Sequence, residues 1–156
     1  KVEISELTGL IETLSSTEYS GMAELAEVAE NLHLDIDELF PLTDVLEIFR
    51  FAYIQDGNLA LTDLGKTFAE VDILKQKEIF AKQLINHVPL ARHIQRVLEE
   101  RYNKTATEDR FLTELQDSLS EGAADEVFKI CIEWGRFAEI FAYNVNKGIL
   151  SLDDPD

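Results

Sequence analysis

The order of hydrophobic periods predicts a mainly α-helical fold with two small β-hairpin wings, arranged as tandem winged-helix-like halves. Three helix-period segments come first, and a strand-period segment containing Asp56-Gly57, a strong hairpin signal, follows them. A second copy of this ending occurs near the C-terminus. We therefore expect a first half over residues 1–74, and a helical segment with a second half over residues 75–156, packed together as one unit.

The internal repeat joins residues 46–61 with residues 132–152. Each copy is the end of an apolar helix followed by a β-rich segment with a glycine turn, which is how a winged helix ends. The copies align at an offset of 86, and at an offset of 91 after five inserted residues. The matched pairs are Glu47 with Glu133, Arg50 with Arg136, Phe51 with Phe137, Ala52 with Ala138, Ile54 with Ile140, Gly57 with Gly148, Leu59 with Leu150 and Leu61 with Leu152.

The first half reads as three helices, a hairpin and a short fourth helix. We expect helices at about 6–14, 22–31 and 35–50, with Ser5 as the first N-cap and Asp35 with Glu38 as a capping box. Strands at 52–55 and 58–61 flank the hairpin turn, and Thr62 caps the fourth helix. The residues expected to face inward from the three helices are Leu7, Leu10, Ile11, Leu14, Met22, Leu25, Ala26, Val28, Ala29, Leu39, Leu42, Val45, Leu46 and Phe49.

The second half begins with a long helical pattern over 73–101, which Pro89 should kink or split near residues 86–88. Thr105 with Glu108 predicts a capping box that opens a helix to about residue 119, and Ser120 caps the next helix, to about residue 135. The second hairpin is expected at 138–152, and the tail at 153–156 is expected to fray. The buried stripe of the last helix is expected to be Val127, Ile130, Cys131 and Trp134.

The net charge of −17 is unevenly distributed over the 156 residues. Residues 1–74 carry 16 acids and 3 bases, and residues 111–156 carry 10 acids and 3 bases. Only residues 75–110 are basic, with 8 bases and 5 acids. Because a nucleic-acid duplex is a dense line of negative charge, the outer thirds would repel it, and we expect no DNA partner. The middle third could instead receive an acidic surface from this chain or a partner.

The sequence offers little for chemistry. Gly65-Lys66-Thr67 resembles the end of a phosphate-binding loop, but Ala60 stands where that motif needs its first glycine. The three histidines lack metal-ligand spacing, so we expect no metal and no cofactor in this segment. The single Cys131 lies in an apolar helical run, which suggests a core position and a reducing compartment. We expect no enzyme here.

One cluster is a candidate for docking. Arg92 and Arg96 share a helix face with His93 beside them, in the only basic part of the chain. These three residues could dock an acidic partner or sense a small anion. The alternative is a solvated face that pairs with the protein's own acids, because surface charge runs usually contribute little.

The third predicted helix would be the DNA-reading helix of a winged helix. Residues 35–50 instead carry five acids and Arg50 as the only base, whereas contacts to guanine or phosphate normally need Arg or Lys. We therefore expect this helix to contact protein. A winged-helix transcriptional regulator remains the alternative.

Several stretches together resemble a known family. They are LTDLGKTFAEVDILKQKEIFAKQLINHVPLARHIQRVLEER (61–101) and IEWGRFAEIFAYNVNKGILSL (132–152), with SELTGLIETL and DELFPLTDVLEIF in the first half. The chain resembles the AAA-associated C-terminal domain, which follows the ATPase domain in some ATP-binding subunits of nitrate, sulfonate, taurine or bicarbonate ABC transporters. The resemblance covers nearly the whole chain and carries no catalytic or ligand-binding residues.

The resemblance implies a non-catalytic regulatory appendage. The ATP and magnesium sites would lie in an upstream domain, which fits a chain that begins at Lys1 rather than at a methionine. The implied partners are that ATPase domain and its twin subunit, and the domain either dimerises across the two subunits or holds them apart. The implied location is cytoplasmic, peripheral to the inner membrane through the transporter complex.

Overall fold

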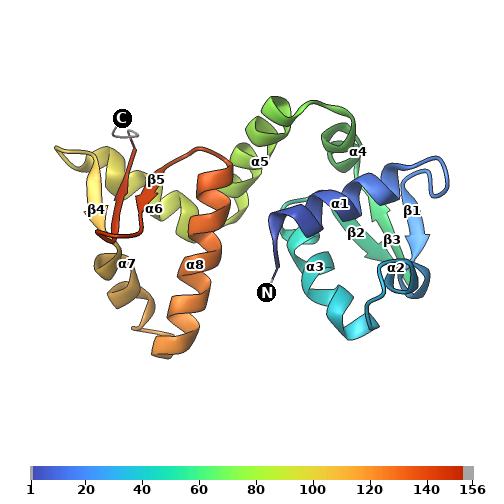
Figure 1. Ribbon diagram of the computed structural model, residues 1–156, viewed down its shortest axis with the longest axis horizontal. Helices are drawn as coiled ribbons and strands as arrows, with labels where there is room; N and C mark the ends of the chain where they lie inside the picture. Colours follow the sequence, from blue (N-terminus) through green and yellow to red (C-terminus); the bar gives the residue numbers. More distant parts are fainter. Residues whose placement is uncertain (1, 153–156) are drawn as a thin grey trace. The chain divides into compact units, whose positions relative to one another are not determined.

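A computed structural model describes residues 2–152, which form two compact units divided between residues 79 and 80 (Figure 1). The described residues are mainly helical, with eight helices and two small three-stranded antiparallel sheets. The predicted class, mainly α with small β wings, is confirmed. None of the described helices is long and apolar enough to span a membrane.

The first unit contains α1 (Ile4–Ser15), β1 (Met22–Glu24), α2 (Leu25–Asn31), α3 (Ile36–Ile48), β2 (Ala52–Gln55), β3 (Asn58–Leu61) and α4 (Asp63–Glu70). Its sheet has the order β1-β3-β2, so that the middle strand is the second strand of the hairpin. Ala23 lies opposite Leu59, and both are buried. The core gathers the buried stripes of α1 and α3 with Phe51 and Phe68, whose rings lie 4.8 Å apart.

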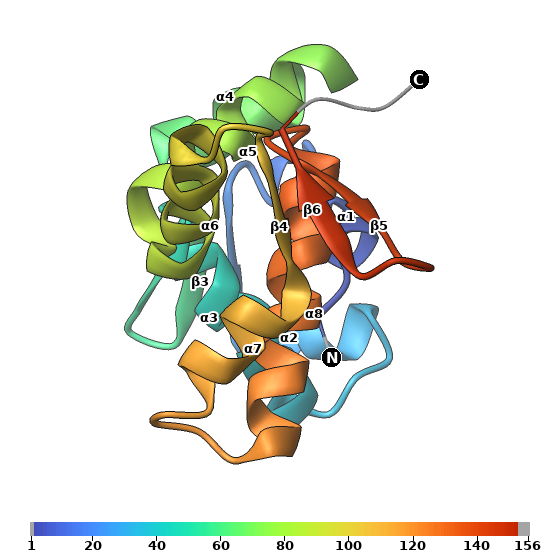
Figure 2. The same ribbon diagram turned by 90° about the vertical axis from the view of Figure 1, so that its left-hand side faces the viewer.

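The second unit repeats this order. α5 (Ile73–His87) crosses the boundary between the units, and α6 (Pro89–Glu100), β4 (Thr105–Thr107), α7 (Glu108–Leu115), α8 (Glu121–Phe137), β5 (Ala142–Asn144) and β6 (Ile149–Ser151) follow it. Figure 2 shows β6 lying between β4 and β5, the same order as in the first sheet. Each unit therefore runs helix, strand, helix, helix, strand, strand, which is a winged-helix-like order.

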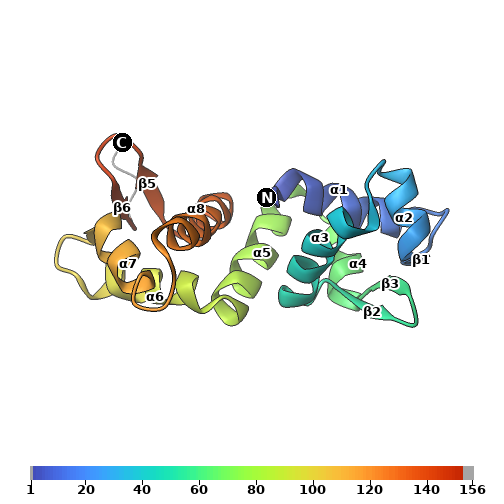
Figure 3. The same ribbon diagram turned by 90° about the horizontal axis from the view of Figure 1, so that it is seen from below.

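Local signals placed several elements correctly. Pro89 splits the predicted long helix into α5 and α6, which meet at an angle (Figure 3), and stands at the start of α6 where no N–H is needed. The Thr62 side chain accepts a hydrogen bond from the Gly65 N–H, and Ser120 caps α8 in the same way. The capping box of Asp35 and Glu38 is present.

The two short strands β1 and β4 were missed. Met22–Glu24 is a strand rather than the start of a helix, and Met22 is 56% exposed. Thr105–Thr107 is likewise a strand, so that Thr107 and not Thr105 precedes α7, which ends at Leu115. Three residues are too few to display a period of two, and their extended backbone is fixed by pairing with β3 and β6.

Three smaller expectations at helices also need correction. The N-cap of α1 is Glu3, which forms a capping box with Glu6, and not Ser5. Val127 of α8 is 41% exposed, whereas Phe128 is buried against Phe111. Ala26 of α2, which was expected to face inward, is exposed, whereas every expected inward residue of α1 and α3 is buried. The expected fraying of the tail lies outside the described residues.

The repeat is real, but its first part aligns at an offset of 89 rather than 86. Phe49 and Ala138 are the C-caps of α3 and α8, and the residue after each, Arg50 or Glu139, has a positive φ. Arg136 therefore occupies the place of Glu47 and not of Arg50. A shift of three residues is close to one helical turn of about 3.6 residues, so the apolar pattern nearly repeats and misleads the alignment. The offset of 91 holds for β3 and β6, where Leu59 corresponds to Leu150.

Candidate interaction surface

The outward side of α3 carries apolar side chains that the core does not use. Ile36, Phe40 and Ile48 are 42%, 40% and 41% exposed, and Asp44 stands between the last two. These four residues, which we call the α3 outer face, follow one another at intervals of four and so form one ridge along the helix. The inward stripe of the same helix, including Leu39, Leu42 and Leu46, is buried. Sequence reasoning missed this ridge because it considered only the acids of the helix.

The charge around the α3 outer face is negative. Asp37 and Asp44 are exposed on α3. The one basic residue, Arg50, folds back on its own helix, where its Nη1 donates to the carbonyl oxygens of Glu47 at 2.8 Å and Ile48 at 3.2 Å. It satisfies carbonyls that the helix end would leave unpaired. The helix therefore presents apolar and acidic groups.

Arg92 belongs to the architecture of the second unit. Its Nη1 donates to the carbonyl oxygens of Ile85 at 3.0 Å and Asn86 at 3.4 Å. Those carbonyls lie in the last turn of α5, where no helical N–H reaches them because the chain breaks before Pro89. The guanidinium of Arg92, in the first turn of α6, thus caps the C-terminal end of α5. This use of Arg92 was not visible in the sequence, because it depends on the angle between the two helices.

His93 and Arg96 differ in their surroundings. The Nε2 of His93 lies 3.1 Å from Glu114 Oε1, and the imidazole ring packs edge-on against Phe111. Arg96 is exposed and makes no hydrogen bond or ion pair within residues 2–152. Two of the three residues of the predicted docking cluster therefore engage their own unit, and docking of an acidic partner at this cluster stays a prediction.

The chemical candidates lie in structural positions. Cys131 is buried in α8, and burial raises the pKa of its thiol to about 12, so the nucleophilic thiolate is disfavoured. Gly65 is inside α4, where its Cα faces the carbonyl of Phe51. Among the described residues, no group of three or more His, Cys, Asp and Glu could hold a metal ion.

These features define a mainly helical protein of two units, each with a small three-stranded sheet, in which the exposed side of α3 is apolar and acidic. The family model of the C-terminal AAA-associated domain matches residues 26–144, well over half of the chain. The protein belongs to this family, whose domain is non-catalytic. Neither the curated proteins nor the solved structures give a match to this chain.

Proposed function

We propose that this chain is the C-terminal regulatory and protein-interaction domain of the ATP-binding subunit of an ABC importer for an anion such as nitrate, a sulfonate, taurine or bicarbonate. Membership of the C-terminal AAA-associated family supports attachment to an ATPase. The observation that carries the interaction role is the α3 outer face, where three large apolar side chains are exposed among acids. The partner is the ATPase domain of the same subunit or its twin.

Physical reasoning favours a protein partner for this face. Water-exposed apolar surface gains about 25 cal/mol for each Å² that a partner covers, and phosphate cannot supply that contact. Acidic residues around the ridge would repel a duplex and attract basic side chains at the rim of a protein interface. The domain therefore regulates by docking, and a change in its docking alters how the two ATPase subunits come together.

Attachment to a transporter subunit can be tested in the source cells. An antibody raised against this chain is used to probe membrane and soluble fractions. We expect a band far heavier than 17.7 kDa in the membrane fraction. A band near 17.7 kDa in the soluble fraction would contradict the transporter assignment.

The role of the α3 outer face needs a second experiment in the parent protein. Phe40→Asp combined with Ile48→Asp should alter ATP hydrolysis and transport control, because it charges the apolar ridge without entering the core. Tyr102→Asp is the matched control, since Tyr102 is fully exposed and lies in the second unit. Unchanged ATPase rate, transport control and subunit assembly in the double variant would exclude regulation through this face.

A DNA-binding regulator is the second candidate, favoured by the winged-helix-like order of each unit. Fluorescence anisotropy with labelled duplexes at low and physiological salt separates the two. The proposal expects no binding at physiological salt. Tight duplex binding at physiological salt that Phe40→Ala abolishes would replace the proposal with the regulator.

A further inference from the structure

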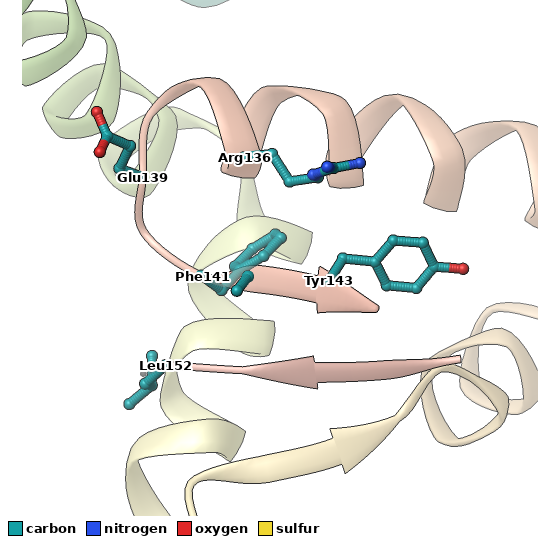
Figure 4. A pocket seen from close by; sticks show the side chains of 6 residues that line it. Arg136, Glu139, Phe141, Tyr143 and Leu152 are labelled. Carbon is teal, nitrogen blue, oxygen red and sulfur yellow. The ribbon is translucent and has the colours of Figure 1, made fainter. Parts of the chain in front are cut away.

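The second unit contains a cavity of about 330 Å³ below the end of α8 (Figure 4). Small-molecule sites begin at roughly this size, about 300 Å³. The walls come from the last turn of α8, the turn that follows it, β5 and the residue after β6. The lining residues are Arg136, Glu139, Phe141, Ala142, Tyr143 and Leu152.

The aromatic wall of the cavity is fixed by a glycine. A Cβ at Gly135 would lie 2.1 Å from Cζ of Phe141, so only glycine lets this ring lie against the helix backbone. Phe141 and Tyr143 are two residues apart, and alternation along an extended segment directs both toward α8. Phe141 is only 4% exposed and forms the buried floor of the pocket, so the half-buried ring of Tyr143 is the aromatic surface that a ligand can reach.

Tyr143 is held in one orientation. Its hydroxyl donates to Glu108 Oε2 at 2.6 Å, at the start of α7. This hydrogen bond raises the pKa of Tyr143 to about 12, so the phenol stays neutral. A locked, neutral ring is a preorganised surface against which a flat or apolar group can pack.

Arg136 is the cationic group of the cavity and has no partner in the described residues. The protein has 31 acids for 14 Lys and Arg residues, yet no carboxylate pairs with this exposed guanidinium within residues 2–152. Figure 4 shows Arg136 extending above Tyr143, whereas Glu139 points away on the other side of the turn. The guanidinium keeps five donors, which suit a planar oxyanion.

The first unit shows that the fold does not require this arrangement. The equivalent places there carry a bulkier helix residue, a small strand residue and the opposite charge, so no comparable aromatic wall or cation forms. Both units nevertheless complete the same sheet order and helix order. The pairs are Leu46 and Gly135, Glu47 and Arg136, Ala52 and Phe141, and Ile54 and Tyr143.

We propose that this cavity, the Arg136 pocket, binds a small organic monoanion, a carboxylate or sulfonate on a flat or apolar body. The Arg136 guanidinium holds the oxygens in a forked geometry, and the body packs on the half-buried ring of Tyr143. A dianion such as phosphate is disfavoured because the Glu108 carboxylate, which accepts the hydrogen bond from Tyr143, adds negative charge beside the site. The inference is independent of the role assigned to the α3 outer face.

Binding is tested on the full chain by calorimetry and by NMR titration at low chloride, with benzoate, benzenesulfonate and inorganic phosphate as probes. We expect benzoate or benzenesulfonate to bind with a dissociation constant on the order of 1 mM. Arg136→Gln should weaken binding roughly tenfold to a hundredfold, the loss of a charge-assisted hydrogen bond. Arg136→Lys keeps the positive charge but loses the two-pronged hydrogen bonding of the guanidinium. Its affinity should lie between those of the wild type and Arg136→Gln.

Arg96→Gln is the matched control, because Arg96 is also exposed and without a partner in the described residues but lies on α6. It should leave binding unchanged. The proposal is overturned if neither organic anion binds, if Arg136→Gln binds as tightly as the wild type, or if Arg96→Gln weakens binding equally. Phosphate binding as tight as that of the organic anions would also overturn it, because it would show non-specific attraction to charge.

Discussion

The same substitution, glycine to alanine, should have opposite effects in two helices of the first unit. Gly9 lies on the exposed side of α1, and a Cβ built there meets no atom within 4 Å. Alanine is favoured over glycine in a helix interior by up to about 1 kcal/mol, so Gly9→Ala should stabilise the unit by nearly that amount. The Gly65→Ala substitution in α4 gains the same helix propensity, but a steric overlap lowers the stability by a larger amount.

The destabilisation expected for Gly65→Ala comes from an overlap with backbone atoms. An added Cβ would lie 2.1 Å from the carbonyl oxygen of Phe51 and 3.0 Å from its carbon. That carbonyl cannot move freely, because it accepts a hydrogen bond from the N–H of Thr62 at 3.0 Å. The hydroxyl of Thr62, which donates to the Arg50 carbonyl at 2.7 Å, also lies 3.2 Å from the Phe51 oxygen. Overpacking costs about 1–3 kcal/mol, and an overlap with fixed backbone belongs at the upper end. Gly65→Ala should therefore destabilise the unit by a net of about 2 kcal/mol.

Urea unfolding followed by far-UV circular dichroism measures both changes. Gly9 and Gly65 lie in one unit, so the same transition reports on both. The expected result is a higher midpoint for Gly9→Ala and a lower one for Gly65→Ala, with slopes equal to the wild type. If Gly65→Ala raised the midpoint as Gly9→Ala does, the close approach of α4 to Phe51 would be refuted.

Three further predictions follow from single side chains. Thr62→Ala removes the cap of α4 and should cost about 1 kcal/mol in the urea transition, whereas Thr62→Ser should retain most of it. Glu108→Gln should lower the pKa of Tyr143 from about 12 toward the ordinary value of 10.0, which ultraviolet titration of the phenol records. Because the folded-state pKa is raised, the stabilisation from this hydrogen bond is complete below pH 10 and is lost as the pH rises toward about 12; an unchanged midpoint across that range would contradict the contact. Cys131 should react with a thiol reagent at pH 8 only after unfolding, and rapid reaction of the native protein would show that the thiol is accessible.

Interaction sites were harder to predict from the sequence than the fold was. Counting acids over residues 35–50 predicted a helix unsuited to phosphate, but it did not predict that Ile36, Phe40 and Ile48 are exposed beside those acids. The basic cluster was visible as a run of charge, yet the use of Arg92 to close α5 depends on the angle at Pro89. The Arg136 pocket could not be predicted from the sequence, because Tyr143 and Arg136 come together only when β5 runs beneath α8.

The sequence by itself determined whatever depends on neighbours along the chain. The hairpin at Asp56-Gly57, the caps at Thr62 and Ser120, the break at Pro89 and the apolar stripes of α1 and α3 all arise within a few residues, and each is present. Tertiary structure decided what depends on distant partners. The strands β1 and β4 exist because β3 and β6 pair with them, and the true register of the repeat became visible only once α3 and α8 ended at Phe49 and Ala138. A helical turn nearly repeats every three to four residues, so local pattern alone cannot separate registers that packing distinguishes at once.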